Sequence, residues 1–187
     1  MRKAVLWFAT FALALTCAFA AWRSYPSWHH GNPAAAPSVV QEAMTISVYF
    51  IASDGSGLVA ESRSIPRPAD VTEGVRAALA ELLAGPKDAR LFSPIPAGTR
   101  LLEVYVDRRQ HAYCDFSKEM RDNHPGGSFA EQMTVFSVVN TLTTDFSTVR
   151  KVQILIEGEP AQTLAGHLDI GRSLTKRLLL ISKLSGQ

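Results

Sequence analysis

Two carboxylates and two histidines are the residues of this chain best suited to acid–base or metal chemistry. Asp115 and Glu119 lie four positions apart, and His111 and His124 lie on either side of them. A positioned carboxylate with a histidine is a pair that hydrolases use for proton transfer. The tripeptide Asp115-Phe116-Ser117 has a simpler interpretation, because Asp and Ser side chains organise turns through local hydrogen bonds. We therefore favour a structural role and assign no catalytic or metal-binding residue to this group.

The other reactive motifs also have structural interpretations. His29-His30 has no further ligand close by in the sequence, which is more typical of a solvated linker than of a metal site. Gly126-Gly127-Ser128 precedes an expected helix, whose free N–H groups attract anions, but the same residues also simply start a helix. Cys114 shares a strand face with Ala112 and Phe116, which indicates a buried apolar side chain rather than a reactive thiol.

The chain lacks the sequence signatures of common enzyme classes. It contains no Gly-x-Ser-x-Gly, His-Glu-x-x-His, Walker-type or Cys-x-x-Cys motif, and these motifs mark hydrolases, zinc proteases, nucleotide-binding proteins and redox proteins. Cys17 lies in the apolar N-terminal stretch, so Cys114 has no partner for an intramolecular disulfide in the domain. We predict a non-enzymatic protein without a cofactor or a bound metal.

The composition predicts one globular domain that does not bind nucleic acid. The chain has 187 residues, of which 47% are apolar, and this is enough for a hydrophobic core of ordinary size. Three of its 19 basic residues, Arg2, Lys3 and Arg23, lie near the N-terminus, and the other 16 are matched by 17 acidic residues. Nucleic-acid-binding domains are basic, and the remainder of this chain has a net charge of −1.

The N-terminal stretch predicts export from the cytoplasm. Met1-Arg2-Lys3 precedes residues 4–22, which are uncharged and mostly apolar, and about 20 such residues span a bilayer as a helix. The stretch also fits a signal peptide with a cleavage site at Ala18-Phe19-Ala20. Both alternatives place the rest of the chain outside the cytoplasm, anchored by residues 4–22 or released after cleavage near Ala20. Lipidation at Cys17 is less favoured, because the residues before it do not form a good attachment motif.

The order of expected elements predicts an α+β domain over residues 44–170, joined to the leader by a flexible linker over residues 23–43. Apolar periodicity predicts strands at 45–50, 58–65, 101–106, 111–116, 152–156 and 161–168, and helices over 70–84 and 128–145. Capping patterns start these helices at Asp70 with Glu73 and at Ser128 with Glu131. The order ββα-ββα-ββ predicts a two-layer sandwich, with an antiparallel or mixed sheet and both helices on one of its faces.

The segment between the first helix and the second hairpin is expected to be rigid. The helix ends at Gly85-Pro86, because Gly takes the left-handed cap and Pro cannot continue the hydrogen bonding. Pro94 and Pro96 then restrict the backbone of the following loop. Alternation places Leu102, Val104 and Val106 on one strand face, before a hairpin turn at residues 107–110.

Residues 171–187 form a basic amphipathic extension. Arg172, Lys176, Arg177 and Lys183 are interspersed with leucines, a pattern that suits a helix lying on an anionic membrane or on a partner. The alternative is a last helix or strand that covers the core. We favour this alternative, because residues 178–181 form a continuous apolar run.

Several of these segments, in this order, resemble the GerMN domain, a module of the spore-germination protein GerM and of many bacterial envelope proteins. The matching segments are VYF at 48–50, LLAGP at 82–86, SPIPAGT at 93–99, DFS at 115–117 with Glu119, TLT at 141–143 and VQILIEG at 152–158. The resemblance covers residues 45–169. It implies an exported, non-enzymatic module, similar to ring-building domains that self-associate or hold partners in envelope assemblies.

We therefore predict a binding module that makes protein–protein contacts in the bacterial envelope, with an envelope protein or with a second copy of itself. An exposed sheet edge, or a sheet face that helices leave uncovered, is the expected contact surface. One alternative is a protein that binds or hydrolyses peptidoglycan with Asp115, Glu119 and a histidine. Another is a self-assembling structural unit.

Overall fold

Alternating apolar residues build the first hairpin of the domain. A computed structural model of the protein describes residues 42–181, so the predicted leader, most of the linker and the end of the C-terminal extension lie outside the described residues. Strands β1 (Ala43–Ala52) and β2 (Leu58–Pro66) pair antiparallel, as predicted. Every second residue of β1 from Ile46 onward is buried in the core. The short strand β3 (Leu91–Phe92) pairs with the end of β1 and gives the order β2-β1-β3.

Helix α2 (Val71–Leu83) begins and ends where the sequence predicts. The Asp70 carboxylate accepts a hydrogen bond from the Glu73 N–H at 2.8 Å, and Glu73 in turn accepts one from the Ala69 N–H at 2.7 Å. Gly85 follows the helix with φ of 84°, a left-handed conformation that glycine adopts without strain. The buried Arg63 guanidinium donates to the Gly85 carbonyl oxygen at 2.8 Å, which ties the end of α2 to β2.

A second sheet contains β4 (Leu101–Val106), β5 (His111–Phe116), β6 (Lys151–Ile156) and β7 (Glu159–Pro160), in that order. Strands β5 and β6 are parallel and the other pairs are antiparallel, so this sheet is mixed. The alternation of β5 is as predicted, because Ala112, Cys114 and Phe116 are all buried. Residues Val152, Ile154 and Ile156 of β6 are buried in the same alternating way.

The prediction for the start of β4 was wrong in one respect. The pairing with β5 shifts register between Leu101 and Glu103, and a bulge of this kind moves the side chains before it to the opposite face. Leu102 is consequently exposed, while Leu101 packs against the core. Val104 is buried on the core face, as the alternation predicts.

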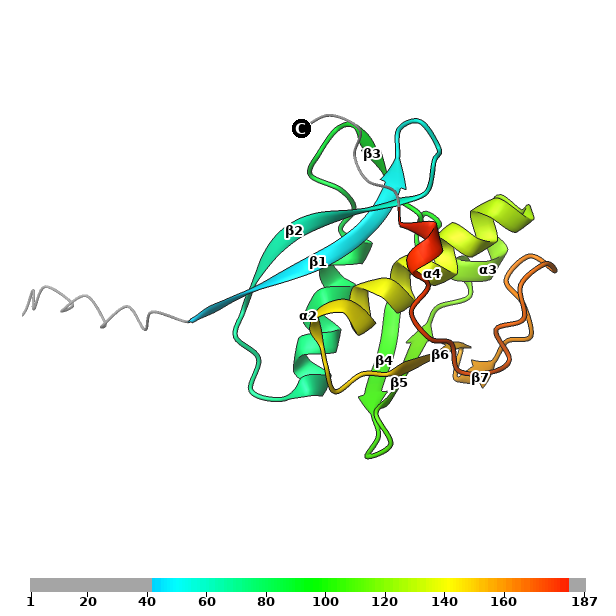
Figure 1. Ribbon diagram of the computed structural model, residues 1–187. Coiled ribbons are helices and arrows are strands. Elements are labelled where there is room, and N and C mark those ends of the chain that lie inside the picture. The colour runs from blue at the N-terminus through cyan, green and yellow to red at the C-terminus, as the bar shows by residue number, and fades with distance from the viewer. Residues whose placement is uncertain (1–41, 182–187) are drawn as a thin grey trace, which may run out of the picture. The chain divides into compact units, whose positions relative to one another are not determined.

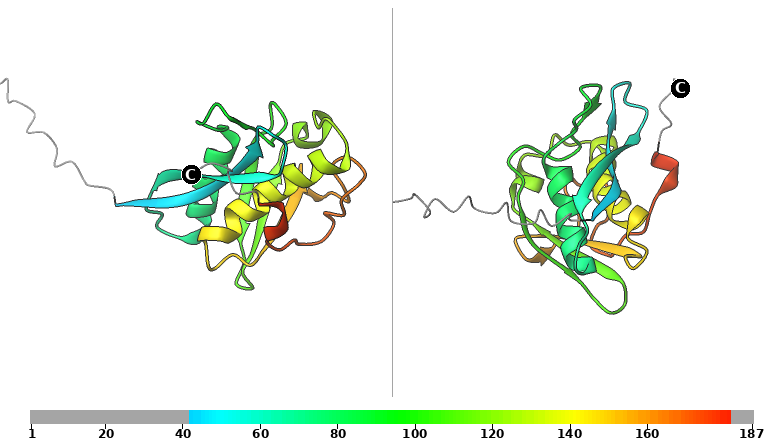
Figure 2. Two further views of the ribbon diagram at one scale, coloured as in Figure 1. Left: turned by 45° about the horizontal axis from the view of Figure 1, so that its top comes forward. Right: turned by 90° about the vertical axis from the view of Figure 1, so that its left-hand side faces the viewer.

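The long helix α4 (Ser128–Asp145) is buried on nearly all sides from Met133 to Leu142. It contacts β1 of the first sheet and β6 of the second, and α2 likewise contacts β1 and β4, so each helix packs against both sheets (Figures 1 and 2). A short helix α3 (Glu119–Asp122) precedes α4. The α+β class and the order of hairpins and helices are confirmed. The single sheet with helices on one face is wrong, because the strands form two sheets.

The separation of the sheets has a local cause at the open edge of β1. The backbone N–H of Ser47 donates to Asp145 Oδ2 at 2.6 Å, and that of Tyr49 donates to Thr141 Oγ1 at 3.1 Å. Two strand residues span about 6.7 Å and four helical residues about 6 Å, so the two spacings match. Helix α4 therefore occupies the edge of β1 that another strand would need.

The predicted capping box at Ser128 and Glu131 is wrong. Gly127 is the residue before the helix, no side chain caps it, and the buried Glu131 binds a distant loop instead. The predicted strand over residues 161–168 is also absent from the described residues, which form a loop after β7.

The C-terminal segment does not form the amphipathic helix within the described residues. It contains one 3-10 turn, η1 (Leu178–Leu180), and isolated bridges from Leu174 to Val152 and from Ile181 to Leu58. These bridges connect the segment to both sheets. The described part of the chain contains no helix long and apolar enough to cross a membrane.

Candidate functional site

The four candidate acid–base residues each contact a different neighbour. Asp115 Oδ1 accepts a hydrogen bond from the Gly158 N–H at 2.8 Å and so orders the turn between β6 and β7. His111 lies at the opposite end of β5, where its ring is 6.5 Å from that of Tyr113. Four strand residues separate these side chains by about 13 Å, so they cannot act on one substrate atom.

Glu119 and His124 have separate surroundings. A hydrogen bond from the Ser117 hydroxyl is the main cause that lowers the pKa of Glu119, so this carboxylate is ionised at neutral pH. His124 contacts Thr134 of α4 instead. No group of three or more metal-ligating side chains forms within residues 42–181. Cys114 is fully buried, and burial raises the pKa of its thiol, which confirms that it is a packed apolar residue.

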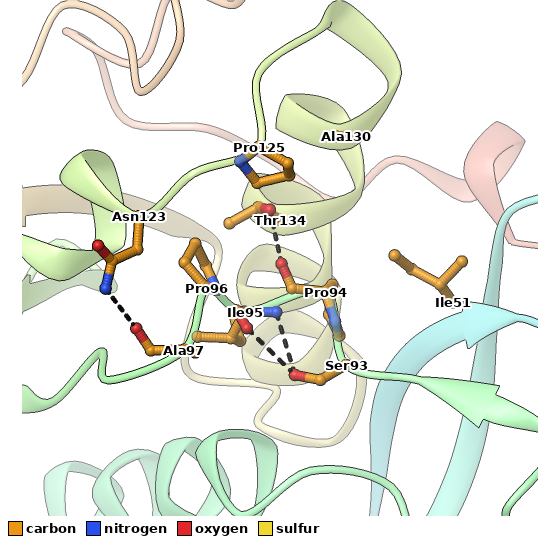
Figure 3. Close-up of a pocket in the computed structure, with 10 residues that line it drawn as sticks. All are labelled: Ile51, Ser93, Pro94, Ile95, Pro96, Ala97, Asn123, Pro125, Ala130 and Thr134. Atoms are coloured by element: carbon orange, nitrogen blue, oxygen red, sulfur yellow. Dashed lines mark hydrogen bonds between the residues drawn. The ribbon is translucent and has the colours of Figure 1, made fainter.

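A pocket of about 270 Å³ lies where the loop after β3 meets the start of α4 (Figure 3). Seven of its ten lining residues have apolar side chains, and the lining consists of Ile51, Ser93, Pro94, Ile95, Pro96, Ala97, Asn123, Pro125, Ala130 and Thr134. None of these side chains carries a charge. The loop over residues 93–97, which sequence analysis expected to be rigid, thus forms one wall of the pocket.

Hydrogen bonds within the lining hold this loop in place. The Ser93 hydroxyl accepts from the Ile95 N–H at 3.2 Å, and the Asn123 side chain donates to the Ala97 carbonyl at 2.7 Å. Thr134 Oγ1 donates to the Pro94 carbonyl at 2.6 Å, and Figure 3 shows these bonds converging on the loop from α4 and from the end of α3. The hydroxyls of Ser93 and Thr134 and the amide nitrogen of Asn123 therefore already have partners within the protein.

His124 extends this network behind the pocket. Its Nδ1 accepts from the Gly126 N–H at 3.0 Å, and its Nε2 lies 3.2 Å from Thr134 Oγ1. Because Thr134 donates its hydrogen to Pro94, Nε2 must donate to Thr134, which fixes the neutral tautomer with the proton on Nε2. Burial is the main cause that lowers the pKa of His124. The negative charge of Glu131 acts to raise this pKa but does not offset the burial. At neutral pH the histidine is therefore an uncharged support of the loop.

This geometry suits binding of an apolar group better than catalysis. Small-molecule sites usually measure about 300–1,000 Å³ and contain free polar groups that orient the ligand. The pocket here is smaller, uncharged, and internally hydrogen-bonded. It has the size and chemistry to accept one apolar side chain, as anchor pockets of protein interfaces do.

A model of the family described as "Germane: Sporulation and spore germination" matches residues 47–162, which is more than half of the chain. The chain belongs to the Germane family. This Germane domain contains every residue of the pocket and all seven strands except the start of β1. No curated protein matches the chain.

Solved structures show the same fold for this Germane domain. It is similar to the tandem GerMN domains of the sporulation protein GerM from Bacillus subtilis, with a TM-score of 0.56 and 23% identity over 72% of this chain and 46% of that one. The chain thus spans just under half of the tandem structure. The first GerMN domain of the same GerM is similar with a TM-score of 0.53 and 25% identity, over 71% of this chain and 97% of that one. A putative lipoprotein from Clostridium perfringens is similar with a TM-score of 0.52 and 22% identity, over 73% of this chain and 90% of that one.

Glu131 is the residue of the Germane domain whose role the sequence did not predict. It is fully buried, and its two carboxylate oxygens accept hydrogen bonds from the backbone N–H groups of Leu164, Ala165, His167 and Leu168 at 2.8–3.2 Å. Burial acts to raise the pKa of Glu131, but the four donors outweigh it and lower the pKa below its ordinary value. The ionised carboxylate therefore holds the loop after β7 against α4.

A sequence signal for this role does exist. Glu131 is the only charged residue between Ser128 and Thr144, and it lies four residues before the buried Val135 on the same helix face. A lone carboxylate on an apolar helix face requires donors, and backbone N–H groups of a distant loop can supply them. The capping pattern at Ser128 and Glu131 predicted instead that Glu131 binds the start of its own helix, and that prediction is wrong.

Proposed function

We propose that this Germane domain is a non-enzymatic binding module of the bacterial envelope, and that its pocket receives an apolar side chain of a protein partner or of a second copy. The single observation that carries the proposal is an uncharged pocket in which the hydroxyls of Ser93 and Thr134 and the amide nitrogen of Asn123 are already hydrogen-bonded. The predicted leader supports a location outside the cytoplasm, anchored by residues 4–22 or released near Ala20. The domain would extend over residues 44–170.

The rigidity of the loop supports this role. Two prolines restrict its backbone, and Thr134 and Asn123 fix two of its carbonyl groups. A wall that is already ordered loses little conformational entropy when a partner binds, so more of the contact energy appears as affinity. Catalysis would require a positioned acid, base or nucleophile, and the lining supplies none.

Two exposed aromatic residues are sequence neighbours of lining residues. Phe92 precedes Ser93 and its exposed fraction is 57%, and Phe129 precedes Ala130 and its exposed fraction is 50%. Aromatic side chains are enriched in the central contacts of protein interfaces. A partner that fills the pocket would be able to bury these rings as well.

A variant that fills the pocket tests the proposal. Ala130→Trp places a large ring into the lining, and we expect it to abolish recovery of the partner after in-cell crosslinking and purification of the protein. The matched control is Ala80→Trp, at an exposed position of α2 outside the pocket, which should leave recovery unchanged. Equal recovery of the same proteins with both variants, and no self-association of the unaltered domain in sedimentation, would contradict the proposed function.

A second candidate function is glycan binding, favoured by the outer face of the second sheet. Tyr105 and Tyr113 are paired across β4 and β5 with ring centroids 6.5 Å apart, and the exposed fraction of Tyr105 is 58%. Exposed aromatic rings provide flat apolar surfaces that also carry a hydroxyl group. The Asp115 carboxylate already accepts a hydrogen bond from the Gly158 N–H, and His111 lies at the other end of β5, so binding, rather than hydrolysis, is the version that this surface supports.

Cosedimentation with purified peptidoglycan tests this second candidate. If the tyrosine face binds glycan, Tyr105→Ala should lower the bound fraction several-fold, since stacking on one aromatic ring contributes about 1–3 kcal/mol in comparable binding platforms. Phe92→Ala is the control, because it removes an equally exposed ring elsewhere. Absence of cosedimentation by the unaltered protein would exclude the glycan function.

A further inference from the structure

We propose that the C-terminal segment over residues 171–181 binds the surface of an anionic phospholipid bilayer, with Leu178 and Leu179 inserted into the interfacial region. The exposed fractions of these side chains are 66% and 93%, higher than those of the other large hydrophobic residues in the described part of the chain. They are adjacent on the 3-10 turn η1. Two neighbouring leucines that protrude into water are a feature of interaction sites rather than of an ordinary surface.

The charge distribution of the chain identifies the kind of surface that these leucines would meet. Residues 42–170 contain 12 basic and 17 acidic residues, whereas residues 171–187 contain four basic residues and no acidic one. Arg172 and Arg177 are exposed within the described segment. Lys and Arg beside exposed apolar side chains favour an anionic lipid surface, where the cations contact headgroups and the leucines reach the acyl boundary.

The segment is held in place by contacts that leave the two leucines outside. The Asn140 side chain accepts from the Arg177 N–H at 3.0 Å and donates to the Arg177 carbonyl at 3.3 Å. The Arg177 guanidinium lies 5.4 Å from the centre of the Phe136 ring. Leu174 and Ile181, on either side, form the bridges to β6 and β2.

The neighbours of the two leucines face the other way. Leu174, Leu180 and Ile181 pack against the core, so the apolar residues of the segment are divided between the protein and the solvent. The backbone between them is fixed at both ends by the bridges. Leu178 and Leu179 are therefore presented in an ordered conformation, which lowers the entropic cost of insertion.

Binding to vesicles tests the proposal. The protein over residues 41–187 is suitable, because it is a compact unit that contains every core residue of the described part of the chain, from Ile46 to Ile170, and lacks the apolar leader, which would itself bind lipid. We expect cosedimentation with vesicles of equal parts phosphatidylglycerol and phosphatidylcholine, a decrease with added salt, and little binding to phosphatidylcholine alone. The double variant Leu178→Ser, Leu179→Ser should weaken binding by about tenfold or more, since it removes both inserted side chains.

Two control variants show whether binding to vesicles depends on this segment and on its charge. Leu102→Ser removes an exposed apolar residue outside the segment and should bind vesicles as the unaltered protein does, whereas Arg172→Glu should weaken binding to anionic vesicles only. Far-UV circular dichroism and thermal unfolding should show that all variants fold. The proposal would be overturned if the folded protein fails to bind anionic vesicles at low salt, if the leucine variant binds equally well, or if that variant instead abolishes self-association in sedimentation.

Discussion

Glu131→Gln is expected to lower the free energy of unfolding by about 3 kcal/mol, because the amide cannot replace a carboxylate that accepts four backbone hydrogen bonds. The NH₂ group of glutamine would face two of the four N–H donors, so at least two backbone donors would lose their acceptor. Denaturant unfolding measures the loss. Hydrogen exchange provides a local measure, because the amides of Leu164, Ala165, His167 and Leu168 should lose protection before the rest of the domain.

The matched control for this substitution is Glu159→Gln, at an exposed position of β7. Surface substitutions of this kind change stability by about 0.5 kcal/mol or less. If Glu131→Gln and Glu159→Gln have equal stabilities and equal exchange rates over residues 164–168, the buried carboxylate does not hold the loop.

The same contact predicts a dependence of stability on pH. Because the pKa of Glu131 is lowered in the folded protein, its contribution to stability is complete above the ordinary glutamate pKa of about 4.3 and is lost as pH falls through the lower folded pKa. The stability difference between the unaltered protein and Glu131→Gln should therefore shrink at acidic pH. A difference that stays constant from neutral pH to pH values well below about 4.3 would contradict the assignment.

Thr141→Val is expected to destabilise the domain by about 1–2 kcal/mol, although valine has nearly the same shape as threonine. The substitution removes the acceptor of the Tyr49 N–H, and this group is buried against α4 at the open edge of β1. Helix propensity does not explain such a loss, since valine and threonine have similar values. Urea unfolding of the two proteins measures the difference.

Thr143→Val serves as the control for this edge contact. The Thr143 hydroxyl donates only to the Val139 carbonyl of its own helix in the described structure, so its removal leaves no buried donor without a partner. We expect a change within about 0.5 kcal/mol. Equal losses for Thr141→Val and Thr143→Val would mean that the helix does not replace a neighbouring strand at the edge of β1.

Local patterns of the sequence predicted most helices and strands of this domain. They could not predict the contacts between segments that are distant in the sequence. The capping box at Asp70, the stripe of α2 and the alternation of β1, β5 and β6 depend on neighbours within a few residues. The division into two sheets depends on Thr141 and Asp145, which meet β1 over more than 90 residues of sequence. A local pattern contains no information about that pairing.

The candidate site shows the same division. The rigid loop over residues 93–99 followed from Pro94 and Pro96, but its role as a pocket wall depends on Asn123 and Thr134, which approach it from other elements. Glu131 satisfied a local capping pattern and was therefore misassigned. The prediction for Leu102 failed for a similar reason. Strict alternation assumes an uninterrupted strand, and β4 contains a bulge that leaves this side chain exposed.

The most direct test of the binding role is a photo-crosslinking side chain at Ala97, which lines the pocket and is exposed, compared with the same side chain at Ala80 of α2. Illumination in cells followed by mass analysis of the purified adducts identifies what lies against the pocket. We expect position 97 to give a discrete adduct with one protein, or with a second copy of the chain, that disappears in the Ala130→Trp background. We expect no such adduct from position 80. The same set of adducts from both positions, unchanged by Ala130→Trp, would contradict the binding role.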